Sequence, residues 1–497
     1  MIQQALQIPN WVLLFHSSLP WLLPLVAALG LLLIPFFLKR GAHLFSLGLS
    51  VTSVVAAMIF NWSLWWKATG VETGMFLFDK ITYLFMFFFL TVTLLTLLLS
   101  YSYLKKLRLF QPEFYALLLF SVVGMACMVA GSDLIVVFLG LEVMSVALYV
   151  LAGFWRDKIV SIEASLKYFL MGAFASGFLL LGIAFLYGAS GTTSLTGLYQ
   201  MGTQLFEGPN ALYTYLAVAL LSIGLGFKIA LVPFHFWAAD VYEGAPVVVT
   251  AFMATAVKAA AFGTLIRVCW ALFQWDNQTL VWLVTGGAVL TMTVGNIAAL
   301  LQNNLKRMLA YSSIAHAGYI LIPFVAFSSQ GVGVVGSVAF YLFAYFLMTI
   351  GAFAIITALT GTDREHSDLA FLAGLGRTQP FLAFAMTLFM LSLAGIPPTI
   401  GFFGKYFLFV QAVRGGFVWL IVVAVLNSAI SVYYYLRPVM VMYFGGEKEE
   451  AALPPFELSY SVLTAVVLCL LGVVFLGIFP DTLLQFLSAS ARLALHP

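Results

Sequence analysis

The chain has 497 residues, enough for three or four soluble domains, but 63% of them are hydrophobic and only 8% are charged. Soluble domains carry about 25% charged residues, so a soluble chain of this length could not cover its surface. The net charge of +3 provides no basic field for phosphates, which excludes a nucleic-acid partner. Cys127, Cys269 and Cys469 lie far apart in apolar stretches, which favours neither disulfides nor a thiolate metal site. The composition predicts a polytopic membrane protein in contact with the lipid bilayer.

Continuous apolar runs of roughly 20 residues, the length that crosses a bilayer as a helix, recur along the whole chain. The predicted fold class is an all-α polytopic membrane protein with about fourteen transmembrane helices. No positive charge precedes the first run, so we expect a retained span and not a cleavable signal peptide. The predicted spans lie near residues 20–38, 43–66, 80–104, 112–131, 133–155, 159–188, 211–234, 246–272, 278–301, 305–327, 331–359, 378–413, 416–444 and 458–487.

Lysine and arginine are distributed unevenly between alternate connections, and cytoplasmic connections carry the excess. One set contains Lys39, Arg40, Lys105, Lys106, Arg108, Arg156, Lys158, Lys306, Arg307, Arg364, Arg377 and Lys448. The other set contains only Lys67, Lys80, Arg267, Arg414 and Arg492. The first set is therefore predicted to face the cytoplasm, which places both termini on the opposite side and requires an even number of spans.

Five charged side chains fall deep inside predicted spans, namely Glu142, Lys167, Lys228, Lys258 and Lys405. A charge at the bilayer centre costs at least about 2.5–3.5 kcal/mol, so five such residues indicate a function. Lys258 lies roughly 16 Å inside its span, near the midplane. Lys167 is the shallowest, and Glu163 one helical turn earlier allows a purely structural ion pair. The alternative is a line of protonatable groups across the membrane interior.

Prolines interrupt two of the spans that carry these lysines. Pro233 follows Lys228 in the seventh span, and Pro397 and Pro398 precede Lys405 in the twelfth. Proline breaks a helix, and the freed carbonyls must be satisfied inside the protein or along a water-filled cavity. Matching breaks in two halves are typical of inverted repeats. The predicted division is 1–111 for spans 1–3, 112–274 and 275–444 for two five-helix inverted repeats, and 445–497 for the last span.

Two histidines are further candidates for proton transfer. His316 lies about ten residues inside its span, where an imidazole can exchange protons near neutral pH, although a hydrogen-bonded structural role is equally compatible. We expect His316 to be the only titratable side chain between Lys258 and Lys405, with ordered water filling the rest of the gap. His235 follows Pro233 and could line the same break. Asp133 is predicted to cap a helix.

Five segments carry longer motifs: LGLEVMSVALYVL, EASLKYFLMGAFASGFLLLG, GFKIALVPFHFWAADVYEGAP, KRMLAYSSIAHAGY and LAGLGRTQPFLAFAMTLFMLSLAGIPPTIGFFGKYFLF. Through these motifs the chain resembles the antiporter-like subunits of respiratory complex I, and the N-type subunits most closely, over roughly residues 75–445. The resemblance implies a fourteen-helix core with two inverted repeats and broken seventh and twelfth helices. Lys405, the lysine within the last of these motifs, favours the N type over the M type. The short segment after the fourteenth span favours the N type over the L type.

The resemblance also implies roles for single residues. Glu142 matches the fifth-helix glutamate, and Lys228 matches the seventh-helix lysine that pairs with it. Lys167 matches the sixth-helix lysine, Lys258 the central lysine of the eighth helix, and Lys405 the twelfth-helix lysine on the outlet side.

The function implied by the resemblance is that of a membrane-arm subunit of a proton-pumping NADH-quinone oxidoreductase, in which other subunits reduce quinone. NADH, FMN, iron–sulfur clusters and quinone are expected in partner subunits, because this chain has neither a dinucleotide-binding glycine pattern nor a cysteine cluster. The expected neighbours are K-like and M-like subunits in a bacterial inner membrane, with both termini periplasmic. A subunit of a cation/proton antiporter without redox activity, or a carrier whose lysines bind an anion, remains an alternative.

Overall fold

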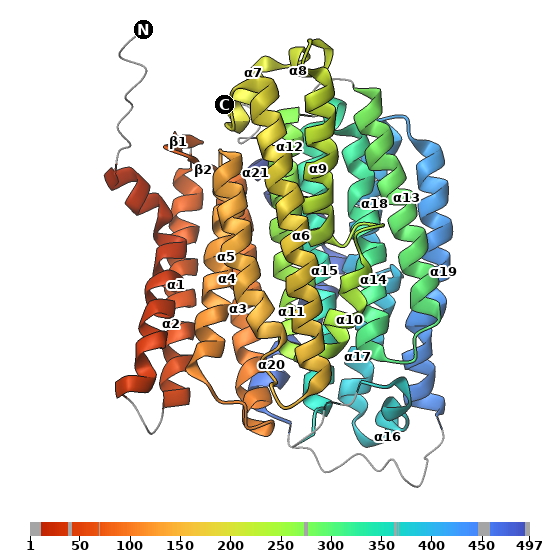
Figure 1. The fold of residues 1–497 in the computed structure, drawn as a ribbon. Coiled ribbons are helices and arrows are strands. Elements are labelled where there is room, and N and C mark those ends of the chain that lie inside the picture. The colour runs from red at the N-terminus through yellow and green to blue at the C-terminus, as the bar shows by residue number, and fades with distance from the viewer. Residues whose placement is uncertain are drawn as a thin grey trace.

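The computed structural model describes residues 11–37, 42–68, 70–272, 277–361, 365, 367–445 and 458–492. Helices stand side by side in one bundle, with a single small hairpin at one end (Figure 1). Twelve helical segments in the described chain are long and apolar enough to cross a membrane. One of them, Leu305–Leu359, holds two predicted spans, and the shorter helix Pro380–Ala394 belongs to a further, broken span. The described chain therefore matches the predicted all-α membrane fold with about fourteen crossings.

The first three spans are α1 (Trp11–Phe37), α2 (Ala42–Lys67) and α3 (Lys80–Lys106). The two-stranded hairpin β1 (Val71–Thr73) and β2 (Phe76–Phe78) connects α2 to α3. Asp79 then begins α3 as its N-cap, because its carboxylate accepts a hydrogen bond from the Thr82 amide at 2.8 Å. Lys39 and Arg40, and likewise Arg364 and Lys448, lie outside the described residues.

The next group of spans corresponds to the predicted first repeat. It comprises α4 (Pro112–Ala130), α5 (Leu134–Ala152), α6 (Ile159–Ser190), α9 (Ala211–Ile229), α10 (Phe236–Gly244), α11 (Val247–Phe252), the π-turn η1 (Met253–Val257) and α12 (Lys258–Leu272). Two short helices, α7 (Leu195–Met201) and α8 (Gln204–Glu207), occupy the connection after α6. Asp133 caps α5 as predicted, since its carboxylate accepts from the Ile135 amide at 2.8 Å.

The following group corresponds to the predicted second repeat and the end of the chain. It comprises α13 (Gln278–Leu300), α14 (Leu305–Leu321), η2 (Ile322–Ala326), α15 (Phe327–Leu359), η3 (Leu369–Leu372), α16 (Leu375–Thr378), α17 (Pro380–Ala394), α18 (Ile400–Arg414), α19 (Val418–Phe444), α20 (Tyr460–Ile478) and α21 (Pro480–Arg492). His316 on α14 is hydrogen-bonded to Tyr341 on α15, so the chain reverses direction between these helices. The predicted last span, 458–487, is divided at Phe479, because Pro480 starts a new helix.

The seventh and twelfth spans are both broken, as predicted. The first half of each ends in a left-handed residue, Ala230 with φ 59° in one span and Gly395 with φ 87° in the other. Two of the carbonyls near the breaks are satisfied by side chains inside the protein. The Phe227 carbonyl accepts from Trp237 at 3.0 Å, and the Ala394 carbonyl accepts from Lys405 at 2.8 Å.

Glycine allows close packing of helix backbones at two places in the bundle. A Cβ atom on Gly124 of α4 would lie 2.6 Å from the Gly140 carbonyl oxygen of α5. A Cβ atom on Gly295 of α13 would lie 2.5 Å from the Ala315 nitrogen of α14. Both helix pairs therefore approach backbone to backbone, as small residues permit in membrane bundles.

Candidate functional site

Lys228 and Glu142 lie near each other at the break in the seventh span. Lys228, in the last turn of α9, is only 3% exposed, and Glu142 projects from the middle of α5. The two charges are close enough to interact electrostatically. The Lys228 Nζ and the Glu142 Oε1 have no hydrogen-bond partner among the described residues, so no direct hydrogen bond joins the two side chains.

Two tyrosines surround the Lys228 ammonium instead. Its Nζ lies 5.4 Å from the ring centre of Tyr149 on α5 and 5.3 Å from that of Tyr168 on α6. Both hydroxyl groups are buried without a hydrogen-bond partner. Buried polar atoms of this kind normally bond to ordered water. Glu142, Tyr149, Tyr168 and Lys228 therefore form a polar cluster in which water can carry a proton.

Gly172 on α6 makes room for this cluster. A Cβ atom there would overlap the Tyr149 hydroxyl and lie 2.8 Å from the ring carbon that bears it. Tyr149, Tyr168 and Gly172 carry no signal in the sequence, because tyrosine and glycine are common in membrane helices and only the fold brings these three together.

Lys167 takes part in a separate network of charged side chains. Its Nζ lies 2.7 Å from a Glu163 carboxylate oxygen and 2.8 Å from an Asp240 carboxylate oxygen, and its side chain is 42% exposed. Asp240 also binds Arg307 at 2.8 Å. The structural pairing with Glu163 that the sequence allowed is thus present. His235 precedes α10 at the break, and its Nδ1 is buried without a partner.

Lys258 is the central lysine, and it directly follows the π-turn η1. It is 2% exposed, and its Nζ donates to the carbonyl oxygen and the hydroxyl of Ser313 on α14. The ring centre of Tyr345 on α15 lies 5.6 Å from the same nitrogen. π-turns inside helices are frequent at functional sites, and no sequence signal indicated this one.

The region between Lys258 and Lys405 contains tyrosine side chains in addition to His316. His316 is hydrogen-bonded through Nδ1 to the Tyr341 hydroxyl and through Nε2 to the Tyr435 hydroxyl, the latter at 2.8 Å. Tyr435 also bonds to Ser312, next to Ser313. The prediction that His316 is the only titratable side chain in this gap is therefore wrong. The tyrosines come from α15 and α19, which are distant from α14 in sequence.

Lys405 on α18 lies at the break in the twelfth span and is 5% exposed. Its Nζ donates to the Ala394 carbonyl and to the Ser428 hydroxyl, both at 2.8 Å. The ring centre of Tyr319, on the same helix as His316, lies 5.1 Å from the nitrogen. Two neutral oxygens and the Tyr319 ring thus face this ammonium.

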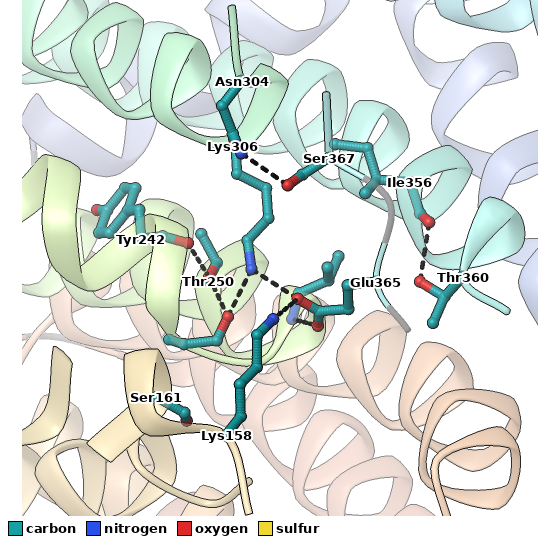
Figure 2. A network of polar contacts seen from close by, with 12 residues as sticks. Lys158, Ser161, Tyr242, Thr250, Asn304, Lys306, Ile356, Thr360, Glu365 and Ser367 are labelled. Atoms are coloured by element: carbon teal, nitrogen blue, oxygen red, sulfur yellow. Dashed lines mark hydrogen bonds and ion pairs between the residues drawn. The ribbon is translucent and has the colours of Figure 1, made fainter. Parts of the chain in front are cut away.

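Sequence reasoning missed a buried carboxylate at one end of the bundle, Glu365, in the connection after α15 (Figure 2). Its oxygens lie 3.0 Å from the Nζ of Lys306 and 3.6 Å from that of Lys158. Burial raises the pKa of Glu365, but the positive charges of Lys306 and Lys158, with hydrogen bonds from Tyr103 and the Val247 amide, outweigh it, so the pKa lies below its ordinary value of 4.5. Lys306, which was predicted to lie in a connection between spans, is 0% exposed.

A second buried pair joins Arg267 to Asp79 at the hairpin end of the bundle. The Arg267 Nη1 donates to Asp79 Oδ2 at 2.6 Å, and both side chains are buried. The assignment of Arg267 to a connection between spans is therefore wrong. The residue lies inside α12, where tertiary packing pairs it with a residue 188 positions away. Within the described chain, no group of three or more potential metal-ligating side chains is found.

Comparisons with known proteins give a consistent result. The family described as "NADH:quinone oxidoreductase/Mrp antiporter, TM" matches residues 131–431. NADH-quinone oxidoreductase subunit N of Trichlorobacter lovleyi is 42% identical over 471 residues, covering 94% of this chain and 95% of that protein. Subunit N 1 of Solibacter usitatus is 41% identical over 478 residues, covering 95% of both chains.

Solved structures show the same fold. A chain of respiratory complex I from Thermus thermophilus with bound aureothin superposes with a TM-score of 0.79 at 35% identity, covering 95% of this chain and 99% of that one. A chain of the Mrp complex from Dietzia sp. DQ12-45-1b gives a TM-score of 0.81 at 22% identity, covering 97% and 98%. The latter likeness shows the fold alone.

Proposed function

Since this chain belongs to the family of NADH-quinone oxidoreductase subunit N, an antiporter-like subunit of the membrane arm, we propose that its own part in the complex is to translocate protons without redox chemistry. The observation that carries this proposal is the polar line across the bundle interior. In that line the Lys258 ammonium contacts Ser313, and His316 bonds to Tyr341 and Tyr435. We propose that protons cross the membrane interior along this line.

The side chains of the line are suited to passing protons in succession. A hydroxyl group can donate one hydrogen bond while it accepts another, and a neutral imidazole does the same through its two nitrogens. We propose that protonation of Lys258 disfavours protonation of Lys405, because like charges repel in a medium of low dielectric constant. A proton that arrives at Lys258 therefore promotes release of a proton from Lys405, which we assign to the outlet.

At the other end of the line, Glu142 and Lys228 act as a coupled pair through water. The Lys228 ammonium faces the rings of Tyr149 and Tyr168, and the unpartnered hydroxyls of these tyrosines can bond to water molecules that link the two charges. His235 at the adjacent break offers a buried nitrogen to the same region. Lys167 belongs to the neighbouring charged network, where it can respond to the protonation of Asp240.

We further assign the division into repeats and the setting of the chain. The matching breaks at Ala230 and Gly395 and the matching close contacts at Gly124 and Gly295 support inverted repeats over 112–274 and 275–444. The setting we assign is a bacterial inner membrane with both termini periplasmic and K-like and M-like subunits as neighbours. NADH, FMN, iron–sulfur clusters and quinone would be bound by other subunits.

Copurification tests this proposal against an antiporter without redox activity. Mild detergent extraction through a tag on this chain should recover a large assembly that contains flavin and iron–sulfur clusters and oxidises NADH with quinone. Recovery of an assembly that exchanges cations for protons and contains no redox centre would contradict the proposal.

A further inference from the structure

Glu365 connects the two helices that bring Lys258 and Ser313 together. We infer that Glu365 is a positioning residue for the proton path: its carboxylate fastens the start of α11 to the start of α14 and thereby holds Lys258 against Ser313. The inference rests on the proposed function, because it assigns a role within the same path. Glu365 lies outside the line itself and touches none of its members.

The segment that carries Glu365 is attached to the start of α14. The Leu305 amide donates to the Ser367 carbonyl at 2.6 Å, and the Asn304 side-chain amide donates to the Ser367 hydroxyl at 2.8 Å. The Lys306 ammonium, also in the first turn of α14, binds Glu365 at 3.0 Å. The carboxylate is therefore held in a fixed position relative to α14 (Figure 2).

The same groups hold the start of α11. The Val247 amide, in the first turn of α11, donates to Glu365 Oε1 at 2.9 Å. The Lys306 Nζ donates in addition to the carbonyl of Ala245 at 2.6 Å, two residues before α11. Glu365 and Lys306 thus form a clip between the two helix starts, and the 2% exposure of the carboxylate keeps water from replacing its partners.

The clip lies on the same two helices as the contact between Lys258 and Ser313. One continuous, fully buried helical span runs from Val247 through the π-turn to Lys258, a separation of about 16 Å. On α14, Ser313 follows Lys306 by about 10 Å. A π-turn contains one residue more than an α-turn, so a change at the start of the span can alter the direction in which Lys258 points.

The other groups that face Glu365 also depend on its negative charge. Lys158 before α6 lies 3.6 Å away, and the Tyr103 hydroxyl on α3 donates to the carboxylate. Two lysines thus share one carboxylate. Its neutralisation removes the carboxylate that the two ammonium groups share beside the α11 start, which opens the clip.

Two substitutions in the complete complex, reconstituted into liposomes, test the inference. Glu365→Gln removes the charge. Val247→Pro removes the amide N–H that donates to Glu365 and keeps a compact apolar side chain at this buried position, and proline is tolerated at the first helical position. Each should lower the proton-pumping rate roughly tenfold, as expected for the loss of a hydrogen bond to a charged group, while NADH oxidation with an artificial acceptor is unchanged. Glu113→Gln, in the first turn of α4 at the same end of the bundle, is the matched control and should pump normally.

Hydrogen exchange distinguishes positioning from general loss of structure. In both variants the amides of 247–257 should exchange faster, while those of α4 and α5 are unchanged. If Glu365→Gln does not assemble, Val247→Pro alone decides. Wild-type pumping in both variants, or in Val247→Pro alone, would overturn the inference. The proposed function would still stand if Lys258→Met abolishes pumping. Normal pumping by Lys258→Met would instead contradict the proposed function.

Discussion

At the scale of single residues, the account depends on which buried groups can release a proton. Arginine keeps its proton under physiological conditions, whereas lysine can exchange it. We therefore expect Lys405→Arg to reduce proton pumping by reconstituted complex at least about tenfold, although the positive charge is retained. Lys167→Arg is the matched control, because Lys167 is partly exposed and an arginine can keep the ion pairs with Glu163 and Asp240. Equal pumping by both variants would contradict the role of Lys405.

The tyrosine next to Lys228 provides a second test at this scale. Tyr149→Phe removes a hydroxyl that is buried without a protein partner, so the free energy of unfolding should change little. Pumping should fall several-fold, because the proposed route between Glu142 and Lys228 runs through water that this hydroxyl can bind. Tyr187→Phe on α6, at a position 55% exposed, should have no effect. A Tyr149→Phe complex with wild-type pumping would exclude the hydroxyl from the path.

At the scale of helices, close backbone packing should determine stability. Gly124→Ala places a Cβ atom 2.6 Å from a carbonyl oxygen of α5 and should lower the free energy of unfolding by about 1–3 kcal/mol. Gly177→Ala on α6 has open space within 4 Å and should change stability by less than about 1 kcal/mol. Thermal unfolding of the purified complex measures both. An equal loss of stability in the two variants would disprove the packing argument.

The Glu365 clip should also respond to pH. The pKa of this carboxyl group is lower in the folded protein than its ordinary value of 4.5, so its stabilising effect is complete above that value and is lost as the pH falls through the lowered pKa. Glu365→Gln should therefore lower the thermal stability at pH 7, and the difference from the wild type should shrink when the pH is taken below about 4.5. A difference independent of pH would show that the carboxylate charge is not involved.

At the scale of the whole molecule, sequence predicts what depends on continuous segments and misses what depends on packing. The crossings and the breaks at Pro233 and Pro397 follow from local run length and proline chemistry. The sequence does not predict the pairing of Arg267 with Asp79, because the two residues are 188 positions apart and meet only in the folded bundle. No sequence pattern singles out Glu365 for the same reason, because its partners Lys158, Lys306 and Tyr103 lie elsewhere in the chain. The contact between Tyr435 and His316 also depends on the fold, because the two residues lie 119 positions apart in the sequence.

The polar line across the bundle unites these observations, and Lys258 is its centre. Lys258→Met tests it most directly, because methionine fills a similar volume and a well-packed apolar residue can replace a buried charge without loss of stability. The measurement is proton uptake into or release from liposomes that contain the assembled complex during quinone reduction by NADH. We predict that Lys258→Met complex oxidises NADH with an artificial acceptor at the wild-type rate but does not pump protons. Wild-type pumping in fully assembled Lys258→Met complex would contradict the account.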